Sequence, residues 1–419
     1  MFRPIRTVLF TLWAVETAFS VPLQYPLTPV PLRLLDPYPD KPRLTFRPDG
    51  MFKLTIFSDL HFGENPNDGV GVVKDANSTR LMRAILQDER PDYVVFNGDL
   101  ITGDYTFREN STLLIDQIMA PLLEAQVLFS STHGNHDNHV NITHLEEIAR
   151  EQKIAPNLSY TRTAPTGVGG VGGPGNYWVP IYTNANDAAP ALVLWFFDSR
   201  GGVSPSGTPL PDWVDASVAP WITRETALMD TAWGTTPRGA LAFVHIAPHA
   251  IQAVQPPSNS SIDLGLNDDP LGGGSVQDSN NIVEEETFTD SQITQDYLRN
   301  ARDAPFFAAL GTIPNLYAVI SGHAHGNEWC ARTRGVQFCF NKHSGYGGYD
   351  KPGWGHGVRN VLFNFSSSPS SEDNVDVDNL RSESEVSVKS TRVETWIRLE
   401  EGKTRARANL VLNGNRNGV

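Results

Sequence analysis

The sequence predicts an α/β fold with parallel strands in its sheet. Three short apolar runs near the start of the chain alternate with helix-like segments, and each run ends in polar residues. Alternation of this kind is typical of βαβ units, which place successive strands parallel to one another. Ligands bind at the carboxyl ends of the strands in open α/β sheets. We therefore expect the polar residues that follow the strands to form a functional site.

The expected elements follow in order along the chain. The first three strands are predicted at 52–58, 93–97 and 127–131, and the helices between them at 78–89 and 112–125. Later strands are predicted at 177–182, 191–197 and 241–245, with a helix at about 221–233. An insertion loop is expected at about 256–290, where the chain is rich in Asp, Asn, Ser and Gly. Two helices, one strand and two antiparallel closing strands follow, at 292–302, 305–310, 317–320, 388–399 and 405–412.

Composition limits the class of protein. At 419 residues with 40% hydrophobic residues, the chain is long enough for one large domain or two ordinary ones with a substantial core. Its formal net charge of −14 makes a nucleic-acid-binding surface unexpected. Acidity does not exclude an anionic substrate, because charges are screened over roughly 8 Å at physiological salt. A local cationic site can therefore still attract phosphate.

The N-terminus has the pattern of a secretory signal peptide. Arg3 and Arg6 precede an apolar stretch, and small residues allow cleavage near Ser20. The apolar stretch is much shorter than the ~20 residues that span a bilayer, so a membrane anchor is the weaker interpretation. We expect a signal peptide at 1–20, an extended Pro-rich segment at 21–49 and one domain at 50–419, without a transmembrane segment.

Two further features agree with a secreted or vacuolar protein. Six Asn-x-Ser/Thr sequons are candidate glycosylation sites, at Asn77, Asn110, Asn141, Asn157, Asn259 and Asn364. The two cysteines, Cys330 and Cys339, flank a turn signal, so a disulfide across a hairpin is expected in an oxidising compartment. Two free thiols are the alternative if the chain is not secreted.

Side chains able to bind metal gather at five predicted strand ends. A single histidine in a strand is usually only packed, but five spaced clusters argue strongly for a site. Asp59 and His61 are two residues apart and so point to the same side of an extended segment. The set mixes carboxylate, amide and imidazole groups, which suits Zn, Mn or Fe better than Ca or Mg. The clusters are Asp59/His61, Asp99, Asn135/His136/Asp137, His245 and His323/His325.

This ordered series resembles the calcineurin-like metallophosphoesterase family, whose pattern runs Asp-x-His, Gly-Asp, Gly-Asn-His-Asp/Glu, His and Gly-His-x-His. The resemblance implies a four-layer αββα sandwich of two mixed sheets flanked by helices. It also implies two metal ions. One would be bound by Asp59, His61, Asp99 and His325. Asp99 would bridge to the second, which Asn135, His245 and His323 would also bind.

The same resemblance implies hydrolysis of phosphate esters, with phosphomonoesters as the first choice. Two divalent ions and two carboxylates leave a local charge of about +2, and metals about 3.5–4 Å apart can share an attacking hydroxide. His136 would be free of metal and would protonate the leaving group, with Asp137 or Asp104 orienting its ring. Phosphodiester or nucleotide hydrolysis is the near alternative. A secreted binding protein without turnover is the other, but it predicts a broken metal set, and none of the eight positions is broken.

The chain also departs from part of the family. True purple acid phosphatases carry an iron-binding tyrosine three residues after the Gly-Asp aspartate, whereas Thr102 stands there, so a purple iron site is not expected. The closer resemblance is to a secretory, purple-acid-phosphatase-like branch with a fungal group, in which a cysteine pair and a Gly-Tyr-rich loop follow Gly-His-x-His. That loop is 345–349. His249 remains an alternative to His245 as ligand, and His343 is a candidate for the substrate pocket.

Overall fold

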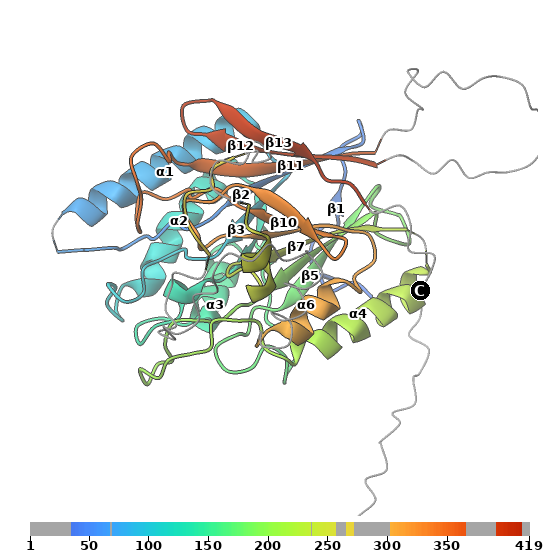
Figure 1. Cartoon of the computed structure of the whole chain (residues 1–419), viewed down its shortest axis with the longest axis horizontal. Coiled ribbons are helices and arrows are strands. Elements are labelled where there is room, and N and C mark those ends of the chain that lie inside the picture. The colour runs from blue at the N-terminus through green and yellow to red at the C-terminus, as the bar shows by residue number, and fades with distance from the viewer. Residues whose placement is uncertain are drawn as a thin grey trace, which may run out of the picture.

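The computed structural model describes residues 35–67, 69–235, 237–256, 265–271, 302–365 and 391–412. Two β-sheets pack face to face, and helices cover the outer face of each (Figure 1). This arrangement confirms the four-layer α/β sandwich of two mixed sheets.

The first sheet has six strands in the order β13-β12-β11-β2-β3-β4. Its parallel half is β2 (Met51–Phe57), β3 (Tyr93–Asn97) and β4 (Leu128–Thr132). The strands run parallel because α1 (Val70–Glu89) and α2 (Ser111–Ala125) return the chain between them. The antiparallel half pairs with the other side of β2 and consists of β11 (Gly357–Phe365), β12 (Thr391–Leu399) and β13 (Thr404–Asn409).

The second sheet has seven strands in the order β1-β5-β6-β7-β8-β10-β9. Parallel pairing joins β6 (Leu192–Phe197), β7 (Gly239–Val244), β8 (Leu316–Ser321) and β10 (Val336–Phe340). The outer strands are β1 (Leu44–Thr45), β5 (Tyr177–Tyr182) and β9 (Cys330–Thr333). The helices α4 (Val218–Trp233) and α6 (Ala304–Leu310) cover this sheet.

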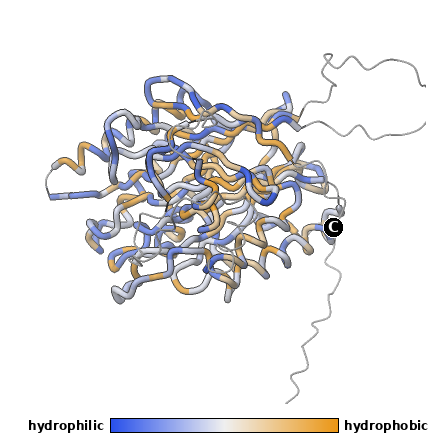
Figure 2. Tube along the Cα trace, in the orientation of Figure 1, coloured by the Kyte–Doolittle hydropathy of each residue, from blue (hydrophilic) through white to orange (hydrophobic). Residues whose placement is uncertain are grey.

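Strand alternation divides the buried side chains among three cores. Along β2, Leu54 and Ile56 face the interior between the sheets, while Phe57 faces the helices α1 and α2. Trp195 of β6 belongs to the third core, under α4 and α6. The central strands are accordingly the most hydrophobic part of the molecule in Figure 2.

The predicted strands agree with the observed ones to within about two residues at most ends, but several elements differ. The helix α1 begins eight residues before the predicted 78, because its first turns expose Val70, Val72 and Val73 and so lack an amphipathic pattern. Sequence periodicity did not predict α3 (His144–Ile154), β11 or the short 3₁₀ helices η1 (Asn135–Asp137) and η2 (His249–Val254). Several predicted features lie outside the described residues. They are the signal peptide, the first part of the 21–49 segment, Asn259, most of the 256–290 insertion, and the helix expected at 292–302 except its last residue.

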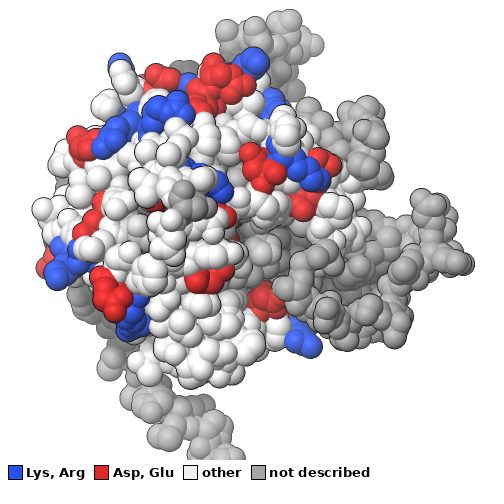
Figure 3. Space-filling model, turned by 90° about the vertical axis from the view of Figure 1, so that its left-hand side faces the viewer, with Lys and Arg blue, Asp and Glu red and all other residues white. Residues whose placement is uncertain are grey.

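The two cysteines lie directly opposite each other on β9 and β10 and form a disulfide. Arg334 and Gly335 make the turn between these strands with positive φ angles of 47° and 77°. No helix in the described ranges is both long and apolar enough to cross a membrane. Acidic and basic side chains are interspersed on the face drawn in Figure 3.

Candidate dinuclear metal centre

Both sheets deliver side chains to one site at the carboxyl ends of their strands. The segment after β2 carries Asp59 and His61, Asp99 follows β3, and Asn135 and His136 follow β4. From the second sheet, His245 follows β7, and His323 and His325 follow β8. Hydrogen bonds hold the two edges together, including one from the Asn97 side chain to the Ile320 carbonyl oxygen at 3.1 Å.

The backbone at this edge is unusual. Four residues have positive φ angles, a backbone region that residues other than glycine rarely occupy. They are Asp59, His61, Asp99 and His323, at 56°, 50°, 49° and 70°. Such conformations cluster at functional sites, where surrounding structure maintains them. Gly98, at φ 85°, has room for no side chain because a Cβ atom there would overlap the His245 ring.

The first group of potential ligands is Asp59, His61 and His325, and all three are buried. The Nε2 atoms of His61 and His325 lie 3.2 Å apart, and His325 Nε2 lies 3.6 Å from Asp59 Oδ1. These separations allow one metal ion to contact all three side chains.

The second group is Asp99, His245 and His323. Asp99 Oδ2 lies 3.0 Å from His245 Nε2 and also 3.7 Å from His61 Nε2 in the first group. Asp99 is therefore placed between the two groups, as a bridging carboxylate must be.

Hydrogen bonds on the outer side of the imidazoles orient them toward a common centre. The Nδ1 atoms of His61, His245 and His325 lie 3.1, 2.8 and 2.6 Å from Thr102 Oγ1, the Asn97 carbonyl and the Tyr349 carbonyl. A carbonyl accepts only from a protonated nitrogen, so in the neutral form of His245 and of His325 the free lone pair is on Nε2, which faces inward.

Two buried polar atoms of the candidate ligands lack ordinary hydrogen-bond partners: Asn135 Oδ1 has none in the described structure, and His245 Nε2 has only the Asp99 carboxylate beside it at 3.0 Å. A buried polar atom without a partner costs about 1–3 kcal/mol. A metal ion would satisfy both atoms, so the residues present fit a dinuclear site.

The charges in the site influence one another strongly. Burial alone would raise the pKa of Asp99, but the His245 and His136 imidazoles hold that pKa well below its usual range. Burial likewise opposes the effect of His325 on Asp59, whose pKa falls to about 2. Burial lowers the pKa of His61 to about 3. The carboxylates and His61 thus have the protonation states that metal binding requires. His245 does not: although burial lowers its pKa, Asp99 raises that pKa to about 10, so this imidazole must lose a proton when it binds a metal.

The side chain of His136 remains partly exposed, at 36%, whereas His61, His245 and His325 are buried. Its Nδ1 lies 3.1 Å from Asp104 Oδ1, and its backbone N–H donates to Asp99 Oδ1 at 2.9 Å. Although burial lowers it, the carboxylates Asp99 and Asp104 raise the pKa of His136 to about 9.

Asp137 does not contact the His136 ring through any hydrogen bond in the described structure. One carboxylate oxygen of Asp137 accepts from the backbone N–H groups of Leu100 and Ile101, at 2.8 and 3.1 Å. The other accepts from Gly134 N at 2.7 Å. The expected catalytic role of Asp137 therefore has no geometric support, because both oxygens hold the backbone of the ligand loops.

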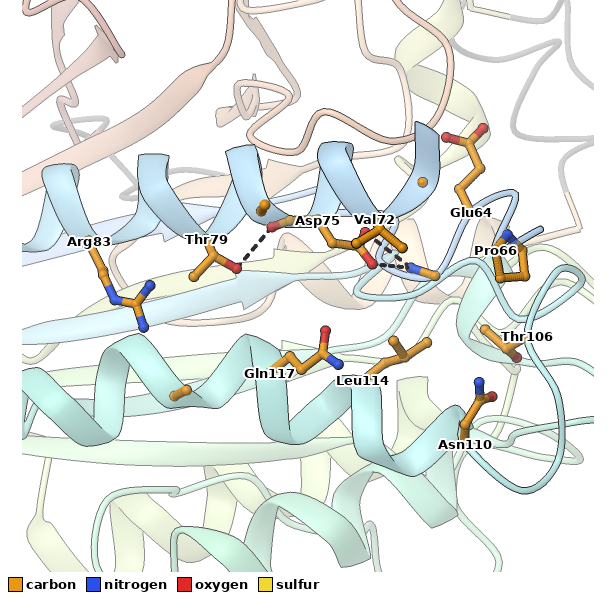
Figure 4. A pocket seen from close by; sticks show the side chains of 14 residues that line it. Glu64, Pro66, Val72, Asp75, Thr79, Arg83, Thr106, Asn110, Leu114 and Gln117 are labelled. Carbon is orange, nitrogen blue, oxygen red and sulfur yellow. Dashed lines mark hydrogen bonds between the residues drawn. The ribbon is translucent and has the colours of Figure 1, made fainter. Parts of the chain in front are cut away.

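A cleft of about 340 Å³ opens over the ligands. His136, Asp104, Tyr105 and Tyr349 are among the residues that line it. A second groove of about 460 Å³ lies between α1 and α2 and shares Glu64 with the cleft (Figure 4). In that groove Asp75 accepts from the Gly63 N–H at 3.2 Å, and none of the seven candidate metal ligands lines it.

Three histidines outside the series have other roles. His249 pairs with Asp303 at 3.4 Å and belongs to neither ligand group, which separates it from His245. His343 is buried and stacks on His325 with ring centres 3.9 Å apart, so it lies behind the ligands and does not line the cleft. The third, His144, belongs to a buried pair beside the Asn135 loop.

No sequence motif predicted this buried pair of His144 and Asp198. His144 Nδ1 lies 2.9 Å from Asp198 Oδ2, and His144 Nε2 donates to the Gly134 carbonyl at 2.8 Å. The pair therefore supports the loop that carries Asn135. Asp198 directly follows the predicted strand 191–197, and this position at a strand end is the sequence feature that could have indicated its place near the site.

The two-sheet sandwich and the two candidate ligand groups are those of a dimetal phosphoesterase-like fold. Residues 52–220 match the model of the calcineurin-like phosphoesterase family. A curated relative, probable inactive purple acid phosphatase 28 of Arabidopsis thaliana, is 26% identical over 74% of this chain and 75% of its own. Phosphatase DCR2 of Saccharomyces cerevisiae is 28% identical over 38% of this chain and 28% of its own. A solved dimetal phosphatase from Danio rerio has a TM-score of 0.46 and 13% identity, covering 86% of this chain and 99% of that one.

Proposed function

We propose that this protein is a dinuclear-metal phosphoesterase that hydrolyses phosphomonoesters. The observation that carries the proposal is the convergence of six potential ligand side chains from both sheets in two groups, with the buried Asn135 Oδ1 left without a hydrogen-bond partner in the described structure. Asp59, His61, Asp99 and His325 would hold one ion. Asp99, Asn135, His245 and His323 would hold the other, with Fe, Zn or Mn as the metals that suit these groups.

When bound, such a metal pair supplies Lewis-acid stabilisation of the phosphoryl oxygens and a water molecule acidic enough to ionise near neutral pH. The rest of the chemistry belongs to side chains of this chain. His136 faces the cleft, with Asp104 on its Nδ1 side. We assign His136 as the general acid that protonates the departing alkoxide from Nε2, and Asp104 as the residue that orients the ring.

The alternative is a protein that binds phosphate esters without turnover. Several curated relatives are named probable inactive purple acid phosphatases, which favours this alternative. Against it, the eight motif positions are intact here, and DCR2 is named a phosphatase.

The decisive experiment is hydrolysis of p-nitrophenyl phosphate and bis-p-nitrophenyl phosphate after chelation and addition of Mn, Zn or Fe. We expect metal-dependent release of p-nitrophenol, faster from the monoester. Faster hydrolysis of the diester would show that the protein is a phosphodiesterase and not a phosphomonoesterase. Protein that binds two ions and hydrolyses neither compound would establish the binding alternative.

We also propose that the chain enters the secretory pathway and acts outside the cell or in the vacuolar lumen. The signal-like pattern at 1–20 and the Cys330–Cys339 disulfide support this proposal. Among the described sequon asparagines, Asn157 is exposed and Asn77, Asn110, Asn141 and Asn364 are half-buried. Expression in a eukaryotic host should give a secreted protein whose mass falls on treatment with an endoglycosidase; an unprocessed intracellular protein would contradict the proposal.

A further inference from the structure

The Gly-Tyr-rich loop at 345–349 packs directly against the first group of metal ligands. At Gly348, where φ is 73°, a Cβ atom would lie 2.6 Å from His325 Cε1 and 2.8 Å from His61 Cδ2. Gly347 is equally close to the His61 backbone. Only glycine permits this approach, so the loop is shaped around the ligands.

Tyr349, at the end of this loop, contacts His325 in three ways. Its carbonyl oxygen accepts from His325 Nδ1 at 2.6 Å, and its hydroxyl accepts from the His325 backbone N–H at 3.0 Å. The two rings stack with centres 4.0 Å apart and planes 4° apart. Since His343 stacks on the opposite face, the His325 imidazole is held between two rings.

The Tyr349 hydroxyl is itself held by Asp269. It donates to Asp269 Oδ2, and Asp269 Oδ2 also accepts from the Gly326 N–H at 3.3 Å. Asp269 belongs to the described segment 265–271, which is fixed to the Gly-His-x-His region. Asp268 N donates to the Gly326 carbonyl at 3.0 Å, and the Asn327 side chain donates to the Asp269 carbonyl at 2.7 Å.

We propose that Tyr349 is a positioning residue for the first metal ion, and that Asp269 acts on that ion through the Tyr349 hydroxyl. This inference rests on the proposed metal centre. It assigns the segment 265–271 a role in assembling one of the two ion sites. The second group is built from Asp99, Asn135, His245 and His323, of which only His323 lies near Tyr349, through its carbonyl oxygen 3.3 Å from the hydroxyl. The effect should therefore fall mainly on one ion.

The test is metal affinity, measured without substrate on the whole protein. Chelated protein is titrated with Zn²⁺ in competition with a chromophoric chelator, and with Co²⁺ by visible absorption. Tyr349→Phe keeps the ring and the carbonyl but removes the hydroxyl. We expect one site to weaken by about 10–100-fold while the other stays within a few-fold of wild type.

Asp269→Asn should weaken the same site, and the double variant should be no weaker than Tyr349→Phe alone, because Asp269 acts through the hydroxyl. Tyr105→Phe is the matched control. Tyr105 is an exposed tyrosine of the same cleft whose hydroxyl makes no hydrogen bond in the described structure, and its loss should leave both affinities unchanged.

Thermal melting in chelator checks that each variant is folded. Unchanged affinities in Tyr349→Phe, equal weakening of both sites, or independent losses in the double variant would overturn the inference alone. Wild-type protein that binds no pair of ions would overturn it together with the proposed function.

Discussion

At the scale of single residues, hydrogen bonds to the atoms that face away from the site hold each candidate ligand in the orientation that metal binding requires. Asp99 shows this most clearly, because Oδ1 accepts from the His136 backbone while Oδ2 lies between His245 and His61. One carboxylate thus connects both ligand groups and the proposed acid. Substitutions of Asn135 and His136 should therefore affect metal binding and proton transfer separately.

The second ion should depend on Asn135. Asn135→Ala removes the amide oxygen that is buried without a partner, so one ion should bind weakly and turnover should fall by more than the roughly 100-fold that outer contacts cost. Metal content by mass spectrometry and p-nitrophenyl phosphate turnover measure this. The exposed Asn184→Ala serves as control and should keep two ions. Retention of two ions by Asn135→Ala would remove Asn135 from the ligand set.

The acid assignment predicts a dependence on leaving group. His136→Ala should keep both ions and lose about 10²–10⁴-fold in turnover of alkyl phosphates, but much less with p-nitrophenyl phosphate, whose leaving group needs no proton. Asp104→Asn should show the same pattern in milder form, because Asp104 contacts the ring. Equal losses on good and poor leaving groups would refute the assignment.

Asp137 provides the contrasting case. Asp137→Asn should lower thermal stability, because its carboxylate accepts three backbone N–H groups and an amide cannot accept as many. The leaving-group dependence should stay as in wild type. A leaving-group effect like that of Asp104→Asn would return Asp137 to the catalytic set.

At the scale of elements, strand ends and helices decide where polar groups are buried. The contribution of two elements to stability can be measured by substitution. The β9–β10 hairpin carries the Cys330–Cys339 disulfide, and the helix α3 carries the buried Glu151.

The disulfide between β9 and β10 closes a short loop. The Cys330→Ala/Cys339→Ala variant should lose about 2–3 kcal/mol in the free energy of unfolding, as expected for a loop with a sequence separation of 9. Urea denaturation with and without reductant measures the loss. Reductant should destabilise wild type and leave the double variant unchanged; equal behaviour of the two would show that the bridge contributes nothing.

Burial of Glu151 on α3 should make stability depend on pH. Burial raises the pKa of Glu151 to about 7, from a usual 4.5, although Ser131 donates to it. The folded protein then holds a proton that the unfolded chain has released, so stability falls as pH rises from about 4.5 to about 7. Glu151→Gln should remove on the order of 3 kcal/mol of that decline, seen in urea midpoints at pH 5 and 7.5.

The control for this pH dependence is Glu109→Gln, because Glu109 is exposed and its loss should leave the decline as in wild type. If the stability of the Glu151→Gln variant fell with pH as steeply as that of Glu109→Gln, burial of Glu151 would not be the cause of the decline.

At the scale of the whole molecule, sequence periodicity predicted an α/β fold with parallel strands because most core strands are continuous apolar runs. The four-layer sandwich was predicted only through the resemblance to a known family. Periodicity missed β11, which contains Arg359 and Asn360 in buried positions, and α3, which buries Glu147 and Glu151. Polar residues in those places do not follow apolar patterns. The ligand series was recognised from motif spacing. Only three-dimensional contacts show that Asp104, and not Asp137, lies beside the His136 ring. Nothing in the local sequence connects Asp269 to Tyr349, because 80 residues separate them.

The strand order of the first sheet has a consequence for synthesis. β2 pairs on one side with β3, made soon after it, and on the other with β11, which begins about 300 residues later. Until β11 emerges from the ribosome, one edge of β2 exposes unpaired backbone groups, which can pair with other chains. Chains cut short before residue 357 would keep that edge open. Production of this protein should therefore depend on chaperones and on an intact C-terminal third more than its N-terminal motifs suggest.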